Sequence, residues 1–350
     1  MTFTDQNKTS VSANIQNILN RDRSGRICIS LVVPVYNEEA GIEPFLDAVL
    51  PILIATGQAY EIVFVNDGSR DQTASALHSA VLSHDHVRMV DLSRNFGKEA
   101  ALSAGLDFSE GDVVIPMDVD LQDPPELVPQ FLEKWREGYD VVNGVRVDRS
   151  TDTTMKRNSA GLFYWLFNKL SPTDLPSNVG DYRLLDRGVV EAIKQMPERN
   201  RFLKGIFAWV GFRTTEIPFT RPERHVGTSS WNYWKLWNFA LDGVIGYSTV
   251  PLRVWTYAGF ALALLSFLYG VLTVLKTLVM GVDVPGYASL ITVILFLSGI
   301  QIISLGIIGE YISRIFIEVK QRPLYLVREV FAKNDLRAPE IDSEDAGDEG

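Results

Sequence analysis

Two long uncharged segments near the C-terminus constrain this 350-residue chain more than any other feature. They cover residues 255–275 and 287–309, and neither contains Asp, Glu, Lys or Arg. A helix rises about 1.5 Å per residue, so each segment can cross a hydrocarbon core of roughly 30 Å. A pair of buried helices in a soluble core is the alternative, but such cores seldom contain two adjacent uncharged segments of this length. We therefore predict two transmembrane helices, at about 254–277 and 287–310.

The charges that flank these segments predict their orientation. The connecting loop at about 280–286 contains Asp283 but no Lys or Arg. The outer flanks carry four basic residues, which are Arg253, Arg314, Lys320 and Arg322. By the positive-inside rule, the hairpin enters from the cytoplasm and returns to it. We therefore predict an integral protein of the inner (cytoplasmic) membrane, with the soluble domain and both termini in the cytoplasm.

The first half of the chain alternates short apolar runs with segments of helical pattern. Strands are expected at 27–34, 61–65, 87–90 and 113–117, and helices at 39–55, 71–82 and 97–108. This alternation predicts parallel β-α-β units with helices on both faces of the sheet. Because ligands of such sheets bind at the carboxyl ends of the strands, we expect the functional residues in the turns that follow them.

Composition excludes several classes of protein. The net charge of −10 disfavours a nucleic-acid partner, and the single Cys28 excludes a disulfide framework or a Cys-based metal site. Residues 1–25 are polar and lack the apolar core of a signal peptide, so we expect a disordered tail that is not exported. Residues 340–350 contain six acidic and no basic residues, which predicts a second disordered tail.

An acid pair follows the expected strand at 113–117. Asp118 and Asp120 are two residues apart at its carboxyl end, so their side chains point to the same side. Two hard oxygen ligands at that place suit a divalent cation that also binds phosphate oxygens. Asp-x-Asp pairs are more often plain surface acids, so this prediction depends on the neighbouring strand ends.

Polar residues also follow the other expected strands. Tyr36 offers a ring face on which a base can stack, and Glu38 offers an acceptor for ribose hydroxyls. Asp67 follows the second strand. Arg94 and Lys98 add cations where an anion can approach a helix N-terminus. Each turn alone is ordinary, but together they predict one cleft for base, ribose, diphosphate and metal.

Four ordered motifs carry a family resemblance. They are Pro-Val-Tyr-Asn-Glu-Glu at 34–39, Asn-Asp-Gly-Ser at 66–69, Arg-Asn-Phe-Gly-Lys at 94–98 and Met-Asp-x-Asp-Leu-Gln-Asp-Pro-Pro at 117–125. The chain resembles the GT-A fold of family 2 glycosyltransferases over about residues 28–328. More narrowly, it resembles the polyprenyl-phosphate glycosyltransferases, the group that contains dolichyl-phosphate mannose synthase and bactoprenol glucosyltransferase. The segments 180–187, 224–229 and 309–314 support the narrower resemblance.

The resemblance implies an α/β fold with a Rossmann-like, mainly parallel sheet and helices on both faces, followed by interfacial helices and a two-helix transmembrane hairpin. The predicted parts are a disordered tail at 1–25, a cytoplasmic GT-A domain at 26–230, interfacial amphipathic helices at 231–252, the transmembrane helices within 253–312, a cytoplasmic segment at 313–332 and an acidic disordered tail at 333–350. Three Trp within residues 231–237 favour the headgroup region for the interfacial helices, while packing on the soluble domain stays an open alternative.

The resemblance also implies roles for single residues. Nucleotide binding falls to six of them, which are Pro34, Tyr36, Glu38, Asp67, Lys98 and Asp118. Asp118, Asp120 and Gln122 would hold Mg²⁺ or Mn²⁺ against the diphosphate. Asn66 stands where many members carry Asp, a departure that bears on the base contacts and leaves the metal site unchanged.

On the acceptor side, the resemblance implies three residues for the lipid phosphate, which are Arg146, Arg157 and Ser159. Arg224 would contact the diphosphate or the acceptor phosphate, because a planar guanidinium suits bidentate contact. Asp181 falls where a family carboxylate faces the reaction centre, and it would position the acceptor or the sugar, or act as a base. Asp181, Asp120 and Arg224 form the predicted catalytic set.

The implied reaction is the metal-dependent, inverting transfer of one sugar from a nucleotide sugar to undecaprenyl or another polyprenyl phosphate. UDP-glucose is the favoured donor, because the two spans and Gly-Glu-Tyr-Ile-x-Arg at 309–314 resemble the bactoprenol glucosyltransferase branch. GDP-mannose, UDP-galactose, UDP-N-acetylhexosamine and UDP-aminoarabinose stay open. So does a non-catalytic membrane scaffold, whereas a processive synthase is disfavoured because no Trp follows an Arg. The family also suggests a homo-oligomer such as a tetramer.

Overall fold

The computed structural model describes residues 15–147, 169, 179–196, 198, 199, 201–220, 248, 250–280 and 286–333. These residues fall into two compact units, each described by itself below. Three predicted site residues lie outside the described residues, and they are Arg157, Ser159 and Arg224. Residues 231–247 of the expected interfacial helices, and the tails at 1–14 and 334–350, lie outside them too.

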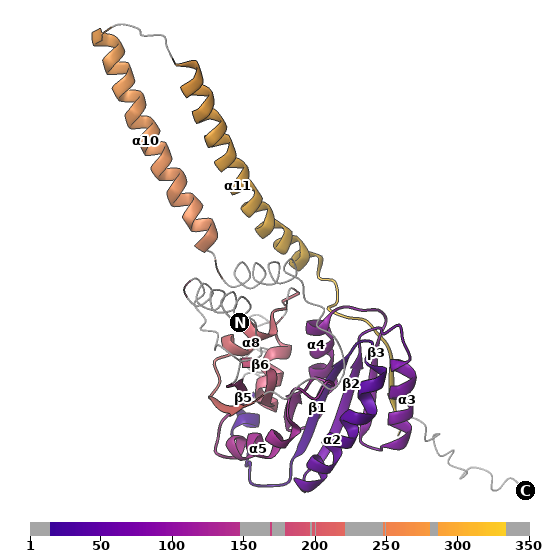
Figure 1. The fold of residues 1–350 in the computed structure, drawn as a ribbon. Coiled ribbons are helices and arrows are strands. Elements are labelled where there is room, and N and C mark those ends of the chain that lie inside the picture. The colour runs from indigo at the N-terminus through magenta and orange to yellow at the C-terminus, as the bar shows by residue number, and fades with distance from the viewer. Residues whose placement is uncertain are drawn as a thin grey trace, which may run out of the picture. The chain divides into compact units, whose positions relative to one another are not determined.

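An eight-stranded sheet forms the centre of the first unit, in the order β7-β5-β6-β4-β1-β2-β3-β8 (Figure 1). The strands are β1 Cys28–Val35, β2 Ala59–Asn66, β3 Val87–Leu92, β4 Val113–Pro116, β5 Val141–Arg146, β6 Val179–Asp186, β7 Thr214–Phe219 and β8 Val327–Ala332. Strand β1 pairs in parallel with β2 and β4, as do β2 with β3 and β5 with β7. Only β6 and β8 run antiparallel to their neighbours among the described strands. The predicted mainly parallel sheet is confirmed.

Helices cover both faces of this sheet, as predicted. One face packs against α2 Ile42–Ala55, α3 Thr73–Ser83 and α5 Val128–Arg136, and the other against α4 Lys98–Phe108, α7 Arg187–Lys194 and α8 Leu203–Trp209. Strand β1 shows why, since Leu31 and Val33 enter the first core while Val32 enters the second. Strands buried on both faces are continuous apolar runs rather than alternating ones. The short helices η1 Glu39–Gly41 and η2 Pro125–Leu127 complete the connections.

Two segments at the ends of the chain belong to this unit. Residues 15–19 are helical, and Arg23 pairs with Asp140 at 2.6 Å. The expected disorder of 1–25 is therefore wrong for its described end, because charge pairing and hydrogen bonds fix a polar segment. Residues 327–332 of the expected cytoplasmic segment 313–332 form β8, which pairs with β3. The other predicted domain limits stay predictions.

The second unit contains two long helices, α10 Val250–Met280 and α11 Tyr287–Lys320, which contact each other. Their most apolar windows, Val254–Thr273 and Phe296–Lys320, are long enough to cross a membrane. Neither window is buried inside the protein, unlike the core helix of a soluble domain. The predicted span at 287–310 overlaps the second window only in part, because α11 continues without a break to Lys320.

Candidate active site

A pocket of about 300 Å³ lies where β1, β2 and β4 end. Its lining consists of Pro34, Val35, Tyr36, Glu38, Asp67, Asn95, Gly97, Lys98, Ala101, Asp118, Val119 and Asp120. The structure therefore brings together all six residues predicted to bind the nucleotide, and Asp120 with them. Their individual roles stay predictions.

The turn after β1 is held in place by the turn after β2. The backbone N–H of Asn37 donates to Ser69 Oγ at 3.0 Å, and Asn37 Oδ1 accepts the N–H of Arg70 at 2.8 Å. Asn37 has a φ of 55°, a left-handed conformation that Asn tolerates better than most residues. This turn leaves the side chain of Tyr36 40% exposed at the pocket, as a stacking surface requires.

Asp67 fixes the loop between β3 and α4. Its two carboxylate oxygens accept the backbone N–H groups of Phe96 at 2.7 Å and Gly97 at 2.9 Å. Burial raises the pKa of Asp67, and these two hydrogen bonds oppose the rise without cancelling it. A Cβ atom on Gly68 would lie 2.3 Å from the carbonyl carbon of Arg94, so the two loops touch at a position that only glycine permits.

Lys98 connects the acid pair to Asp181. Its Nζ lies 2.7 Å from Asp118 Oδ1 and 3.0 Å from Asp181 Oδ2. Strand β6 runs antiparallel to β4, with Val113 opposite Asp186, so its amino end returns Asp181 to this edge of the sheet. Burial alone would lower the pKa of Lys98, but Asp181 and Asp118 outweigh it and raise the pKa. Burial opposes ionisation of Asp181, yet Lys98 and Lys204 hold its pKa below the usual range.

Asp120 lies in a strained turn. Asp120 Oδ1 accepts the backbone N–H of Gln122 at 3.1 Å, and Leu121 between them has a φ of 55°. Such backbone strain costs about 1–3 kcal/mol and gathers at functional sites. The side chain of Gln122 is buried in this turn.

The carboxylates of this pocket fit a magnesium or manganese ion. Such ions take hard oxygen ligands, and proteins often supply only one or two carboxylates while substrate phosphates and water complete the shell. Asp118 and Asp120 supply that number. The described part of the chain contains no group of three or more His, Cys, Asp or Glu placed to hold a metal. A bound ion would therefore depend on its substrate for several ligands.

Arg146, predicted to bind the acceptor phosphate, lies beside this edge. It ends β5, and its Nη2 atom is 3.3 Å from the position that a Cβ atom on Gly180 would take. Gly180 precedes Asp181 in β6, so the absence of a side chain there leaves room for the guanidinium.

Sequence reasoning missed Glu99 and Lys204. Glu99 Oε2 accepts the N–H of Leu203 at 3.1 Å, which joins the first turn of α4 to the start of α8. Burial, and then the charge of Asp181, raise the pKa of Glu99 to about 7. Glu99 follows directly after the Arg-Asn-Phe-Gly-Lys motif, which was its only signal. No sequence signal connects Lys204 to the site.

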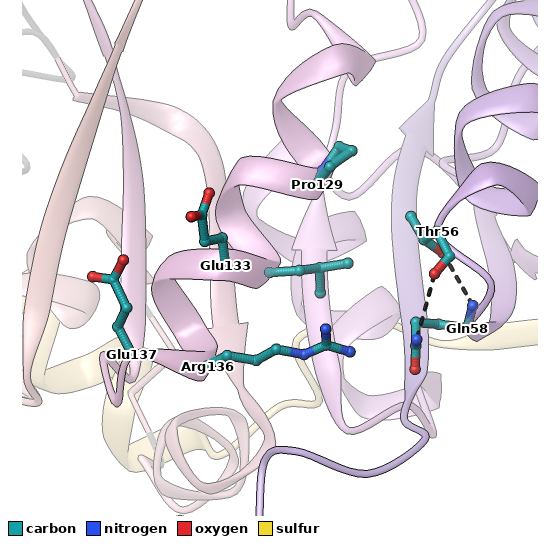
Figure 2. A pocket seen from close by; sticks show the side chains of 7 residues that line it. Thr56, Gln58, Pro129, Glu133, Arg136 and Glu137 are labelled. Carbon is teal, nitrogen blue, oxygen red and sulfur yellow. Dashed lines mark hydrogen bonds between the residues drawn. The ribbon is translucent and has the colours of Figure 1, made fainter.

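A second pocket, of about 450 Å³, lies at the other end of the strands. Figure 2 shows the side chains that line it. Its lining comes from α5, the residue that follows α5 and the connection before β2, and consists of Thr56, Gln58, Pro129, Leu132, Glu133, Arg136 and Glu137. It contains none of the predicted site residues and lies at the amino end of β2, where ligands of such sheets are not expected.

Comparison with known proteins gives two family matches and close relatives. Glycosyl transferase family 2 matches residues 30–194, and the GtrB C-terminal hairpin matches residues 250–315. The SfII prophage-derived bactoprenol glucosyl transferase of Shigella flexneri is 52% identical over 300 residues, which are 86% of this chain and 97% of that protein. An uncharacterized glycosyltransferase of Synechocystis is 52% identical over 303 residues, 87% of this chain and 95% of that protein.

Among solved structures, glucosyl-3-phosphoglycerate synthase from Mycobacterium tuberculosis, in complex with Mn²⁺, UDP-glucose and phosphoglyceric acid, has a TM-score of 0.42. It is 21% identical, and the match covers 65% of this chain and 80% of that one.

Proposed function

The chain belongs to glycosyltransferase family 2, and we propose that it transfers one glucose from UDP-glucose to a polyprenyl phosphate at the cytoplasmic face of a membrane. The observation that carries this proposal is the pocket lined by Lys98, Asp118 and Asp120, in which Lys98 pairs with Asp118 and also with Asp181. Relatives that are named bactoprenol glucosyl transferases and match most of the chain support both the sugar and the lipid acceptor.

The donor binds with its base on the exposed ring of Tyr36, its ribose hydroxyls on Glu38 and its diphosphate toward Asp118 and Asp120. A divalent cation held by Asp118, Asp120 and Gln122 would act as a Lewis acid that stabilises the diphosphate as leaving group. The loop fixed by Asp67 keeps Lys98 in position. The positive charge of Lys98 offsets the carboxylates of Asp118 and Asp181 at the place where the diphosphate and the acceptor phosphate would meet.

The acceptor phosphate attacks the anomeric carbon from the face opposite the diphosphate, which inverts that carbon. A phosphate monoester carries about 1.5 to 2 negative charges near pH 7, so the attack needs no strong base. The lowered pKa of Asp181 makes it a weak base, which favours a positioning role. Arg146 lies beside Gly180, the residue before Asp181, and serves as a cation for the incoming phosphate.

The chain topology supports a cytoplasmic active site on a two-span anchor. Strand β7 precedes α10 and strand β8 follows α11, yet both strands belong to one sheet. A hairpin whose two flanks join one soluble sheet has both ends on the same side of the membrane. The basic outer flanks favour the cytoplasmic side. An acceptor confined to the membrane then meets a soluble donor beside its anchor, which is a gain in proximity.

A donor screen tests the proposal. Full-length protein in detergent, with undecaprenyl phosphate and Mg²⁺ or Mn²⁺, is given a panel of UDP- and GDP-sugars while glycolipid formation is followed. Asp120→Ala is the test variant, and Asp47→Ala on the exposed face of α2 is its matched control. We expect glycolipid from UDP-glucose, abolished by EDTA and lowered about a hundredfold or more by the first substitution only. Nucleotide binding without transfer to any lipid would contradict the acceptor, and a protein that binds no nucleotide would contradict the enzymatic function.

A further inference from the structure

The segment that follows the membrane hairpin lies against a loop of the candidate active site. The backbone N–H of Ser93 donates to the carbonyl of Leu326 at 2.8 Å. The carbonyl of Ser93 accepts from Arg328 Nη2, also at 2.8 Å. Both backbone polar groups of Ser93 are therefore bonded to the C-terminal segment. Ser93 begins the loop 93–97, which leads directly to Lys98.

Arg328 is placed by an irregularity in its strand. Asp91 pairs with Glu329 and Leu92 with Val327, so Arg328 is an extra residue in the pairing of β3 with β8. A β-bulge of this kind re-aims a side chain and is frequent next to active sites. Here it sends one guanidinium to two acceptors, Asp91 Oδ2 at 3.1 Å and the carbonyl of Ser93.

Asp91 connects Arg328 to the nucleotide pocket through a chain of hydrogen bonds. Its side chain is buried, and its Oδ1 atom accepts the amide Nδ2 of Asn66 at 2.8 Å. Asn66 Oδ1 in turn accepts the N–H of Ser69 at 3.2 Å. Asn66 precedes Asp67, whose carboxylate holds the N–H groups of Phe96 and Gly97. The loop that carries Lys98 is thus fixed from both sides, by Asp67 and by the strand that follows the hairpin.

Apolar packing reinforces the contact. Tyr325 and Val327 pack against the same small core as Phe96, and the hydroxyl of Tyr325 donates to Asp107 Oδ2 at 2.7 Å. Strand β8 makes a different contact at its far end, where Lys333 pairs with Asp85 at 2.5 Å. Neither Lys333 nor Asp85 lines the pocket, which makes Lys333 a matched control for Arg328.

We propose that Arg328 is a positioning residue for the donor pocket. Through its bonds to Ser93 and Asp91, Arg328 holds the 93–97 loop and Lys98 in place. Donor binding then requires the chain on both sides of the membrane hairpin. This inference rests on the proposed function only in that the pocket binds a nucleotide. The rival explanation is that β8 is an edge strand that contributes stability alone.

The test compares Arg328→Gln, Arg328→Lys and Lys333→Gln in the full-length protein. Three quantities are measured: the Kd for UDP with Mn²⁺, the KM and kcat with UDP-glucose, and the hydrogen exchange of peptides that cover 93–98. We expect Arg328→Gln to raise Kd and KM about threefold to tenfold, with kcat changed less than about twofold. This change corresponds to the lower part of the range of interaction energies between residues of one hydrogen-bond network. A low value is expected because the Arg328 side chain is 59% exposed. Amide exchange at 93–98 should become faster in the same variant.

Arg328→Lys should recover part of the affinity, since an ammonium keeps the charge but cannot form both bonds in the same plane. Lys333→Gln should bind UDP as the wild type does. Equal affinities and equal exchange at 93–98 for Arg328→Gln and Lys333→Gln would overturn the proposal. So would faster exchange confined to β3 and β8. A wild type that binds no nucleotide would refute the proposed function. The effect of Arg328 on the loop would still be decided, because hydrogen exchange is measured without substrate.

Discussion

Strand β6 carries an aspartate near each end, Asp181 and Asp186. Both lie close to basic side chains, but one of the two charge clusters faces an open pocket and the other is buried. Asp181 pairs with Lys98, which also lies 2.7 Å from Asp118 at an open pocket. Asp186 is fully buried, and its Oδ2 atom accepts the indole N–H of Trp135 at 2.7 Å. The first cluster presents charge to a space that a ligand can enter, whereas the second is closed.

The carboxylate of the closed cluster finds its partners within the protein. Asp186 Oδ1 accepts the N–H of Gly188 and so caps α7 at 2.8 Å. The guanidinium groups of Arg21 and Arg23 lie 3.4 Å and 3.7 Å from Asp186 Oδ2, and both stack on the ring of Trp135. A group of charges therefore indicates function only where part of it faces an accessible pocket. Substitutions at the two ends should separate activity from stability.

The largest effect is expected at the open end. Asp120→Ala should lower kcat by about 10²–10³, the cost of removing one group that stabilises developing charge. The melting temperature should stay close to that of the wild type, because Asp120 lines an open pocket. Glycolipid formation and thermal unfolding are measured side by side. A large loss of stability here would erase the distinction between the two clusters.

The closed end should show the reverse. Asp186→Ala leaves a buried indole N–H and a helix cap without their acceptor and removes one partner of the half-buried Arg21 and Arg23, and it should lower the free energy of unfolding by about 3 kcal/mol. The fraction that remains folded should bind UDP with unchanged affinity. Denaturant unfolding and UDP titration check this, with Asp47→Ala as the surface control. Weakened UDP binding in the folded fraction would show that the clusters are coupled.

Substitution of Asp181 distinguishes a positioning role for this residue from a role as catalytic base. Because Lys98 and Lys204 hold its pKa below the usual range, Asp181 does not titrate near neutral pH. Asp181→Asn should therefore lower kcat about ten- to hundredfold through misplacement of the substrate, without changing the shape of the rate profile between about pH 6 and 9. Rates across that range are the measurement. An acidic limb present in the wild type and lost in the variant would assign Asp181 as a base.

The sequence predicted four of the eight strands, β1 to β4, because these central strands are largely apolar runs, as β2 and β4 illustrate. It did not predict β5, β6 or β7, nor β8, whose pattern is half exposed and includes Arg328 and Glu329. Edge strands bury too little to leave a clear apolar signal. The described end of the N-terminal segment was missed for a related reason, since Arg21 and Arg23 look like solvent-exposed residues until Asp186 and Asp140 are brought to them.

The pocket could be predicted where strand ends alone determine it. Tyr36, Asp67 and Asp118 all follow parallel strands, and parallel strands end at one edge. Contacts set by long-range register could not be predicted, because no local pattern reports them. The reversal of β6 places Asp181 beside Lys98, and α8 brings Leu203 to Glu99.

The smallest expected effect concerns Glu99, at the margin of the open cluster. Its pKa is about 7 in the folded protein, above the ordinary value of 4.5, because burial and Asp181 disfavour its charge. A carboxyl group with a raised folded pKa contributes stability that is complete below the unfolded pKa and lost as pH rises through the folded one. The wild type should therefore lose stability between about pH 4.5 and 7 in a way that Glu99→Gln does not.

The melting temperature of Glu99→Gln, relative to the wild type, should rise by several °C between pH 5 and pH 8. The matched control is Glu133→Gln, on the exposed side of α5 in the remote pocket of Figure 2, and it should show no such trend. Parallel melting curves for Glu99→Gln and the wild type would mean that Glu99 does not titrate in this range. A pH-dependent difference between the two melting temperatures would show that the charges of the open cluster lower the stability of the protein. The closed cluster around Asp186 avoids this cost because its charged groups are paired.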